Sequence, residues 1–519
     1  MNREVSLHLE PTGRGLVAAP GTLLQDLLFE EGVEFPCGGQ GACGKCRVRV
    51  VSGRLDATGE DISLLGEEAV DAGWRLACRG RITHDATLLL AQWDARVLSD
   101  NTPIEVSSRD GWGIAVDLGT TTVAAQLVEL AAGNVLSVRV GLNPQVACGA
   151  DIMSRVHYAV TGGGALRLTT IIRRYVGAIV RELLNEAIQS DHPAKSLREV
   201  VVVGNTVMHH LFAGYDVASL ARCPFNTPHP AEAVFSAADL EWDLPAPCQV
   251  RFLPCLGGFV GSDVLAGVIA TGMDRSPGLQ VLIDLGTNGE IVVTDGDRML
   301  CAATAAGPAF EGARIRMGMR ATHGAIDRVT IAQDRGRGQL QCHVLGGVAP
   351  QGVCGSGLID AASCALELGL LAANGRLTGG SDRLPLAGSV FLHQCDIREL
   401  QLAKGAIAAG IMILLDRLHG RIDDVADVYL CGAFGNYLDV EHARRLGLLP
   451  FPVTNVRTMG NTALLGAKIA LLAGEESQCR MSEVCRRMEH VGIHEEHSFM
   501  DVYVRNMPFP MSLRQGKNS

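Results

Sequence analysis

The sequence predicts a multidomain protein that joins an α+β unit to a larger α/β domain. Its 519 residues exceed what one small core can organise, so the length alone predicts two to four domains. Residues 1–95 combine a strand-like start, a leucine-faced helix, a cysteine-rich loop and a second strand. From residue 113 to about 475, glycine-rich turns follow apolar strands and alternate with long helical stretches, which is typical of a mixed α/β domain.

The elements of the first unit follow from its hydrophobic pattern. The segment VSLHL alternates like a strand, and the chain then turns through Gly13 and Gly15. Four leucines, at positions 23, 24, 27 and 28, share one helix face, and Arg47 to Val50 alternates again. Residues 96–112 are polar and contain proline, which predicts a linker. The long stretch from Leu166 to Ile188 predicts a helix, and residues 476–519 are expected to form a C-terminal extension.

Composition restricts the classes of protein to consider. A formal charge of −11 argues against general nucleic-acid binding, which needs a basic surface. No apolar run reaches the roughly 18 residues of a membrane span, and the first residues do not resemble a signal peptide. We therefore expect a cytoplasmic protein without membrane or nucleic-acid partners. The sixteen cysteines are spread over a long chain, which favours reduced thiols and a metal cluster over disulfides.

The strongest local signal is a set of four cysteines. Cys37, Cys43 and Cys46 lie in one glycine-rich loop, CGGQGACGKC, and Cys78 lies further along. Three thiolates in a tight loop with a distant fourth are the plant-type arrangement for a 2Fe-2S cluster. The C-x5-C-x2-C spacing is one residue longer and resembles the adrenodoxin-like branch. A structural zinc site uses the same ligands, but zinc ribbons usually pair two Cys-x-x-Cys knuckles.

Two apolar strands end in the same Asp-Leu-Gly-Thr sequence. The first loop contains Asp117, Gly119, Thr120, Thr121 and Thr122, and the second contains Asp284, Gly286, Thr287, Asn288 and Gly289. Phosphates can approach the glycines and accept hydrogen bonds from the threonines, while the two aspartates are placed to hold Mg²⁺ through its waters. A single Asp-x-Gly turn is common in hairpins, so the repetition is what favours nucleotide binding.

These loops resemble the two phosphate loops of the superfamily that contains actin, Hsp70 and the sugar and acetate kinases. A third segment, from Val428 to Gly435, resembles its adenosine segment and contributes Gly432, Ala433 and Gly435. The resemblance implies a two-lobed ATPase fold, with hinge helices that follow Gly204-Asn205-Thr206 and Gly460-Asn461-Thr462.

Other motifs have weaker support. The segment Gly307 to Gly312 is expected to place a helix N-terminus against the nucleotide, with Glu311 accepting a hydrogen bond from a sugar hydroxyl. The segment Gly352 to Gly357 is expected to line the nucleotide cleft. For each segment, a structural turn is the alternative. His209-His210 is expected to be core or capping. The histidines of HEEH, at 494 and 497, are three apart and not four, so a zinc-protease site is not predicted.

Together these motifs resemble the reductive activators of corrinoid-dependent methyltransferases. The resemblance covers nearly the whole chain and implies a β-grasp ferredoxin-like domain (1–95), a linker (96–112), an actin-like ATPase domain (113–475) and the extension (476–519). It implies that Cys37, Cys43, Cys46 and Cys78 hold the cluster. It also implies that Asp117, Thr120, Thr121, Asp284, Gly286, Thr287 and Gly432 form the Mg-ATP site.

The implied activity is ATP-dependent, one-electron reduction of a corrinoid protein from cob(II)alamin to cob(I)alamin. The implied partners are that protein and an upstream reductase or ferredoxin, with a homodimer as an option. Well-described members carry a further small domain where this chain has only the linker, which leaves dimerisation and movement of the ferredoxin unit open. Rival interpretations are an activator of another low-potential enzyme, a non-catalytic ATP-gated redox sensor, and a small-molecule kinase, although a kinase leaves the cluster unexplained.

Overall fold

The fold was analysed in a computed structural model. It describes residues 4–10, 14–29, 46–90, 109–161, 163–189, 195–244, 246–286, 288–304, 307–312, 314–322, 324–334, 337–345, 348–432 and 438–510. Five residues that the sequence assigned to sites, Cys37, Cys43, Thr287, Ala433 and Gly435, lie outside these ranges, as does the side chain of Glu311.

The N-terminal unit is a five-stranded mixed sheet in the order β2-β1-β7-β4-β5. Its strands are β1 (Val5–Glu10), β2 (Arg14–Ala18), β4 (Arg47–Gly53), β5 (Trp74–Leu76) and β7 (Ala86–Leu90). The smaller elements are α1 (Leu24–Phe29), α2 (Gly59–Leu65), α3 (Glu67–Asp71) and the pair β3 (Thr22–Leu23) and β6 (Arg81–Ile82). Leu24 and Leu28 of the predicted leucine face are completely buried, which confirms the α+β prediction. Ala147, from the next domain, packs against this core.

The first lobe is a six-stranded sheet in the order β10-β9-β8-β11-β13-β12. Its strands are β8 (Trp112–Leu118), β9 (Thr122–Glu129), β10 (Val135–Leu142), β11 (Leu197–Val203), β12 (Ala233–Ser236) and β13 (Gln249–Phe252). The helices α4 (Ile152–Val160), α5 (Gly164–Gln189) and α6 (Thr206–Ala213) share a hydrophobic core with it. The helix predicted from Leu166 to Ile188 is α5.

The second lobe is a six-stranded sheet in the order β23-β22-β14-β15-β16-β24. Its strands are β14 (Gln280–Leu285), β15 (Gly289–Thr294), β16 (Met299–Thr304), β22 (Asp427–Cys431), β23 (Val456–Gly460) and β24 (Met488–His490). A smaller sheet of β17 (Ala325–Asp334), β18 (Arg337–Val344) and β19 (Gly352–Val353) packs on α8 (Gly355–Glu367). The remaining elements are β20 (Arg383–Ala387), β21 (Val390–His393), α9 (Gln394–Arg417), α10 (Val440–Leu446), α12 (Glu475–Arg487) and α13 (Phe499–Asn506).

The two lobes repeat one topology. In each, an antiparallel three-strand meander (β8-β9-β10 or β14-β15-β16) continues into two parallel strands (β11-β13 or β22-β23). The repeated Asp-Leu-Gly-Thr sequence therefore lies at the first hairpin of each lobe. This duplication confirms the two-lobed, actin-like fold class.

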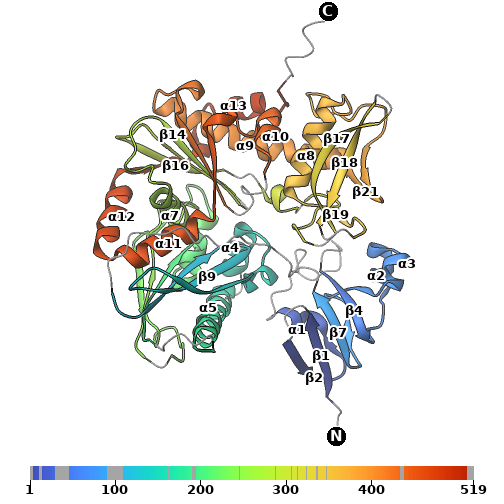
Figure 1. Cartoon of the computed structure of the whole chain (residues 1–519), viewed down its shortest axis with the longest axis horizontal. Coiled ribbons are helices and arrows are strands. Elements are labelled where there is room, and N and C mark those ends of the chain that lie inside the picture. Colours follow the sequence, from blue (N-terminus) through green and yellow to red (C-terminus); the bar gives the residue numbers. More distant parts are fainter. Residues whose placement is uncertain are drawn as a thin grey trace, which may run out of the picture.

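Two helices, α7 (Ser262–Thr271) and α11 (Thr462–Ala473), pack together between the sheets (Figure 1) and share one core with both. They approach closely because Gly466 has no side chain: a Cβ there would lie 2.1 Å from the carbonyl oxygen of Ala266. The expected hinge helix after Gly460-Asn461-Thr462 is thus confirmed. The prediction that the helix after Gly204-Asn205-Thr206 is the second hinge helix is wrong. That helix, α6, is buried in the core of the first lobe, and α7 packs against α11 instead.

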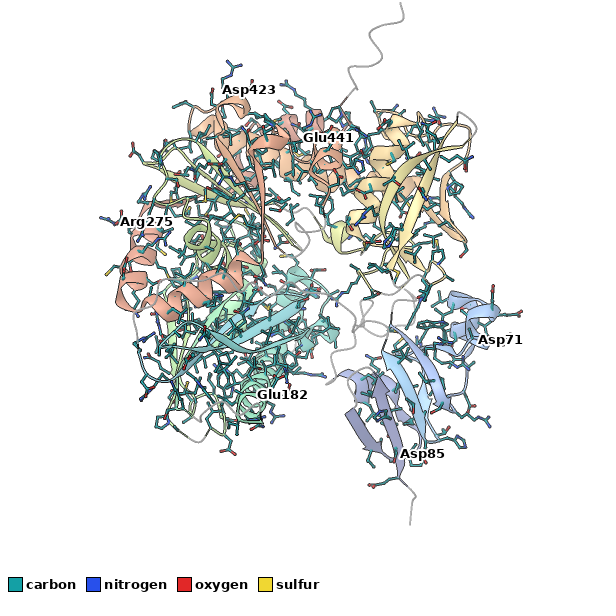
Figure 2. The ribbon with its side chains drawn as sticks, in the orientation of Figure 1. Asp71, Asp85, Glu182, Arg275, Asp423 and Glu441 are labelled. Atoms are coloured by element: carbon teal, nitrogen blue, oxygen red, sulfur yellow. The ribbon has the colours of Figure 1, made fainter. Side chains whose placement is uncertain are left out.

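The described part of the expected extension, residues 476–510, is integrated into the second lobe. Strand β24 pairs in parallel with β16, and α13 packs on α9. Lys404 Nζ donates to the carbonyl oxygen of Pro508 over 2.6 Å. The domain boundaries at 95, 112 and 475 stay predictions. No helix in the ranges given above has the length and apolarity to cross a membrane. Charged side chains such as Asp71, Glu182 and Asp423 lie on the outside (Figure 2).

Candidate functional site

The two predicted phosphate loops each follow an aspartate near the end of a strand and turn at a glycine. Asp117 and Asp284 are each the next-to-last residue of the first strand of their lobe. At the first turn the Gly119 N–H donates to the carbonyl oxygen of Thr122 over 3.0 Å, and at the second the Gly286 N–H donates to that of Asn288 over 3.0 Å. A Cβ on Gly119 would lie 2.6 Å from the Thr122 oxygen, so the first turn requires glycine.

Four carboxyl groups gather where the loops meet. Asp263 in the first turn of α7 and Glu290 of β15 join Asp117 and Asp284. Burial raises the pKa of Asp284 from 3.8 to about 7, and the charge of Asp117 adds to this. Burial followed by the charges of Asp284 and Asp117 raises the pKa of Asp263 to about 8. Burial also raises the pKa of Glu290 well above its usual value, with further contributions from Asp263 and Asp284.

This acidic cluster (Asp117, Asp263, Asp284 and Glu290) suits a hydrated cation. Among the described residues, no three of its oxygen atoms lie close enough together to hold an ion directly. Mg²⁺ usually keeps several waters and binds through one or two carboxylates plus substrate phosphates. The donor set therefore fits Mg²⁺ delivered with a nucleotide better than a metal caged by protein alone.

Asparagines at two helix N-termini position the first loop. Asn461, the N-cap of α11, donates through Nδ2 to Asp117 Oδ2 over 2.8 Å, while its Oδ1 accepts from the Leu464 N–H. Burial raises the pKa of Asp117 to about 6 although this hydrogen bond lowers it. Asn205, the N-cap of α6, donates to Thr120 Oγ1 over 2.9 Å. Two positive helix ends thus lie beside the loop, as an anion site requires.

Gly432, at the end of β22, belongs to the predicted adenosine segment. Its φ is +86°, and a Cβ there would lie 2.6 Å from Asp284 Oδ1. Its N–H donates to the carbonyl oxygen of Gly460 over 3.0 Å. The absence of a side chain therefore lets β22 end directly against the second phosphate loop.

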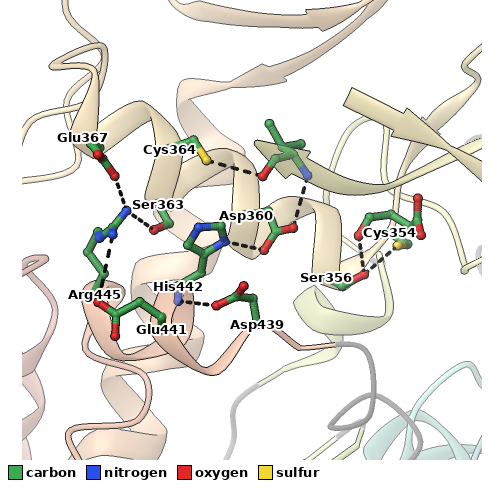
Figure 3. Close-up of polar contacts among 12 residues, drawn as sticks. Cys354, Ser356, Asp360, Ser363, Cys364, Glu367, Asp439, Glu441, His442 and Arg445 are labelled. Atoms are coloured by element: carbon green, nitrogen blue, oxygen red, sulfur yellow. Dashed lines mark hydrogen bonds and ion pairs between the residues drawn. The ribbon is translucent and has the colours of Figure 1, made fainter. Parts of the chain in front are cut away.

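An ion pair joins helices α8 and α10 (Figure 3). His442 Nδ1 of α10 lies 2.7 Å from Asp360 Oδ1 of α8, and Asp360 Oδ2 accepts from the Val329 N–H over 3.1 Å. Burial lowers the pKa of His442, but hydrogen bonds to Asp360 and Cys364 and the nearby acids outweigh it and raise the pKa to about 10. The imidazole is therefore charged at neutral pH and holds α8 and α10 together.

Two of the four predicted cluster ligands are described. Cys46 and Cys78 are both buried, and they come from separate chain segments. The Cys78 N–H points at Cys46 Sγ, with a separation of 3.5 Å, and the Ala77 N–H donates to the carbonyl oxygen of Cys46 over 2.8 Å. Backbone N–H groups aimed at a sulfur stabilise a thiolate ligand of an iron-sulfur cluster and tune its potential. The arrangement fits the cluster that the sequence predicts.

The remaining sequence motifs have different outcomes in the structure. His209 and His210 are completely buried, which confirms them as core residues. Residues Pro308–Glu311 form one turn of 3-10 helix, which agrees with the structural turn given as the alternative, and the contact of Glu311 with a sugar hydroxyl stays a prediction. The segment Gly352 to Gly357 opens α8. Sequence reasoning missed Asp263 and Glu290; the only signals were an acid in a first helical turn and one just after the second loop.

Comparisons with known proteins agree with this architecture. Three family models match: a 2Fe-2S iron-sulfur cluster binding domain at residues 7–83, the RACo middle region at 112–276, and the C-terminal ASKHA domain of RACo at 278–516. The corrinoid activation enzyme RamQ of Eubacterium limosum is 33% identical over 438 residues, which cover 79% of this chain and 72% of RamQ.

Two further relatives match at lower identity. The reductase of the Co(II) methylated amine-specific corrinoid protein from Methanosarcina barkeri is 27% identical over 433 residues, covering 77% of each chain. A solved structure titled as the reductive activator for corrinoid, iron-sulfur protein aligns with a TM-score of 0.69 and 26% identity, covering 99% of this chain and 100% of that one.

Proposed function

The chain belongs to the family of reductive activators of corrinoid proteins. From this premise we propose that it reduces the corrinoid protein of a methyltransferase system by one electron, from cob(II)alamin to cob(I)alamin, and that this reduction requires ATP. The observation that carries the ATP requirement is that Asp117 and Asp284, each just before the first turn of its lobe, lie close enough for the charge of Asp117 to raise the pKa of Asp284. Mg²⁺ and the phosphates of ATP would lie between them.

The residues around the nucleotide have distinct roles in this proposal. Asp117 and Asp284 would bind the waters of Mg²⁺, and Asn461 fixes the Asp117 carboxylate by its hydrogen bond. Thr120, oriented by Asn205, would donate to a phosphate oxygen. Gly432 would let the adenosine lie against the end of β22. Asp263 and Glu290 would ionise more readily beside a bound cation, because a positive charge opposes the burial and repulsion that raise their pKa values.

The cysteines Cys37, Cys43, Cys46 and Cys78 would hold the 2Fe-2S cluster, which supplies one-electron transfer. An upstream reductase or ferredoxin would provide the electron. Clusters of this kind lie near about −400 mV, and each further 100 mV uphill costs about 2.3 kcal/mol per electron. Differential binding of ATP and corrinoid protein to the open and closed lobes would offset this, because about 5.5 kcal/mol shifts an equilibrium from 1:99 to 99:1.

The test is an anaerobic reduction assay with the holoprotein, a chemical reductant and a corrinoid protein encoded near its gene. We expect the cob(II) spectrum to change to the cob(I) spectrum when Mg-ATP is present. We expect no change without nucleotide, and none with the Asp284→Asn variant. Asp423→Asn, an exposed substitution in the same lobe, is the matched control and should behave as the wild type. Equal conversion without ATP would refute the ATP requirement. No conversion of any corrinoid protein would favour the sensor.

A further inference from the structure

A cysteine, a histidine and a glutamate from distant parts of the chain meet on the surface. Cys223 follows the short 3-10 turn Ala218–Ala221 of the first lobe, whereas His494 and Glu495 lie in the turn Ile493–Glu495 that follows β24 of the second lobe. Cys223 Sγ lies 3.4 Å from His494 Nε2, across 271 residues of sequence, and that nitrogen lies 3.8 Å from Glu495 Oε1. One potential ligand atom from each residue lies within 4.8 Å of the other two.

We propose that Cys223, His494 and Glu495 form a zinc site that joins the two lobes. A thiolate sulfur, an imidazole nitrogen and a carboxylate oxygen are all ligands that Zn²⁺ takes in proteins, and three protein ligands leave its fourth position open. Binding would release the thiol proton of Cys223, because only the thiolate ligates the metal. The fourth position would hold water or a side chain of a partner.

One of the three ligand separations already has the value of a tetrahedral zinc site, and a second is close to it. Bonds of about 2.3 Å to sulfur and about 2.0–2.1 Å to nitrogen and oxygen, at tetrahedral angles, put sulfur and nitrogen about 3.6 Å apart and nitrogen and oxygen about 3.3 Å apart. The sulfur and nitrogen already match, at 3.4 Å. The Glu495 side chain is 57% exposed, so a small rotation is enough to close the remaining half ångström.

Neighbouring residues hold these ligands in place. The ring of Phe225 contacts the His494 imidazole edge to face, with centroids 5.1 Å apart, and Phe259 packs on Phe225 in turn. Phe225 has a φ of +58°, and its carbonyl oxygen lies where a Cβ on Gly258 would come within 2.6 Å. The Phe225 N–H donates to the carbonyl oxygen of Arg222 over 2.7 Å, which closes the turn that contains Cys223.

A hydrogen bond without a metal explains part of the geometry. A hydrogen bond between the Cys223 thiol and the His494 imidazole accounts for the 3.4 Å contact without any metal. It does not require the Glu495 carboxylate, and it does not predict that an ion stays bound after dialysis. Zinc binding and a simple thiol–imidazole pair therefore give different experimental results.

The experiment is equilibrium dialysis of the anaerobic holoprotein against Zn²⁺, followed by metal analysis. We expect one zinc per chain, lost in Cys223→Ser and in His494→Gln, with the iron content unchanged in both. Cys479→Ser removes an exposed thiol elsewhere on the second lobe and should keep the zinc. The proposal is overturned if the wild type and Cys223→Ser retain equal zinc, or if Cys479→Ser loses as much.

A second measurement does not depend on the variants folding. Alkylation of the wild-type protein, read out by mass spectrometry of the peptide that contains Cys223, should slow at least tenfold when Zn²⁺ is added, whereas alkylation of Cys479 should not change. Equal modification of Cys223 with and without Zn²⁺ would also overturn the proposal. Neither readout uses corrinoid reduction, so both are independent of the proposed function.

Discussion

Replacement of Asp284 by asparagine should stabilise the nucleotide-free protein while it removes ATP binding. The Asp284 carboxyl lies among buried groups and beside other acids, and its pKa rises from 3.8 to about 7. An asparagine of the same shape does not ionise. The variant therefore avoids the free energy that the folded wild type needs to ionise this group at neutral and alkaline pH.

The size and sign of the effect follow from the two pKa values. Below pH 3.8 the carboxyl is protonated in the folded and the unfolded chain, so it does not affect stability. Between pH 3.8 and about 7 the unfolded chain alone ionises, which destabilises the fold by about 1.4 kcal/mol per pH unit. Asp284→Asn should thus raise the free energy of unfolding by about 4 kcal/mol at pH 8. This figure is an upper limit, because water reaching the carboxyl screens part of the charge.

Chemical denaturation at pH 5 and pH 8, with and without Mg-ATP, measures this. The stability gain of Asp284→Asn should be about 3 kcal/mol larger at pH 8 than at pH 5. Saturating Mg-ATP, at about 100 times its Kd, should stabilise the wild type by about 2.7 kcal/mol and leave the variant unchanged. The exposed control Asp423→Asn should differ from the wild type by less than about 0.5 kcal/mol. A variant that is less stable at pH 8, or a gain independent of pH, would refute the reasoning.

Three further predictions concern the hinge, the cluster and the ion pair. Gly466→Ala should destabilise the protein by roughly 1–3 kcal/mol or more, because its Cβ meets backbone at 2.1 Å. In the same helix pair Gly267→Ala, whose Cβ meets a side-chain oxygen at 3.3 Å, should stay within about 1 kcal/mol; equal denaturation midpoints would contradict this. Cys78→Ser should lose its iron and its visible absorption while ATP still binds, and a variant that keeps two irons per chain would show that Cys78 is no ligand. His442→Gln should lower the free energy of unfolding by about 3 kcal/mol at pH 7, where the pair with Asp360 is charged. The difference should shrink as the pH approaches 10, because the raised pKa of His442 stabilises the fold only while the ring is protonated.

Sequence patterns predicted the parts of the fold whose signals are local. The hairpins that follow Asp117 and Asp284 could be placed because an apolar strand, a glycine turn and a second strand are adjacent in the chain. The leucine face of α1 and the long helix α5 have their own periodicity. The charges that meet at the site were harder to foresee. Asp263 reaches it through the packing of α7 between the sheets, and Glu290 through its register opposite Asp284 in the hairpin.

The error about the hinge has a specific physical origin. Asn205 and Asn461 follow glycine in identical Gly-Asn-Thr sequences, and both are N-caps that donate a second hydrogen bond to the first phosphate loop. The shared sequence therefore encodes a helix start beside the first predicted phosphate loop, and it does not by itself mark a hinge. Topology assigns the hinge instead: α7 follows β13 and α11 follows β23, the last parallel strand of the corresponding series in each lobe.

The acidic cluster supplies a physical reason for the lobes to respond to nucleotide. Asp117 and Asp263 belong to the first lobe and its hinge helix, whereas Asp284 and Glu290 belong to the second. The raised pKa values of Asp263, Asp284 and Glu290 reflect repulsion from neighbouring carboxylates added to burial. Without a cation, ionisation of these groups opposes close approach of the lobes. A hydrated Mg²⁺ that arrived with ATP would reverse the sign of that interaction, because each carboxylate would then be attracted to a charge between them. Lobe closure would thus depend on the cation that accompanies the nucleotide, and loss of the phosphates would restore the repulsion that opens the lobes again.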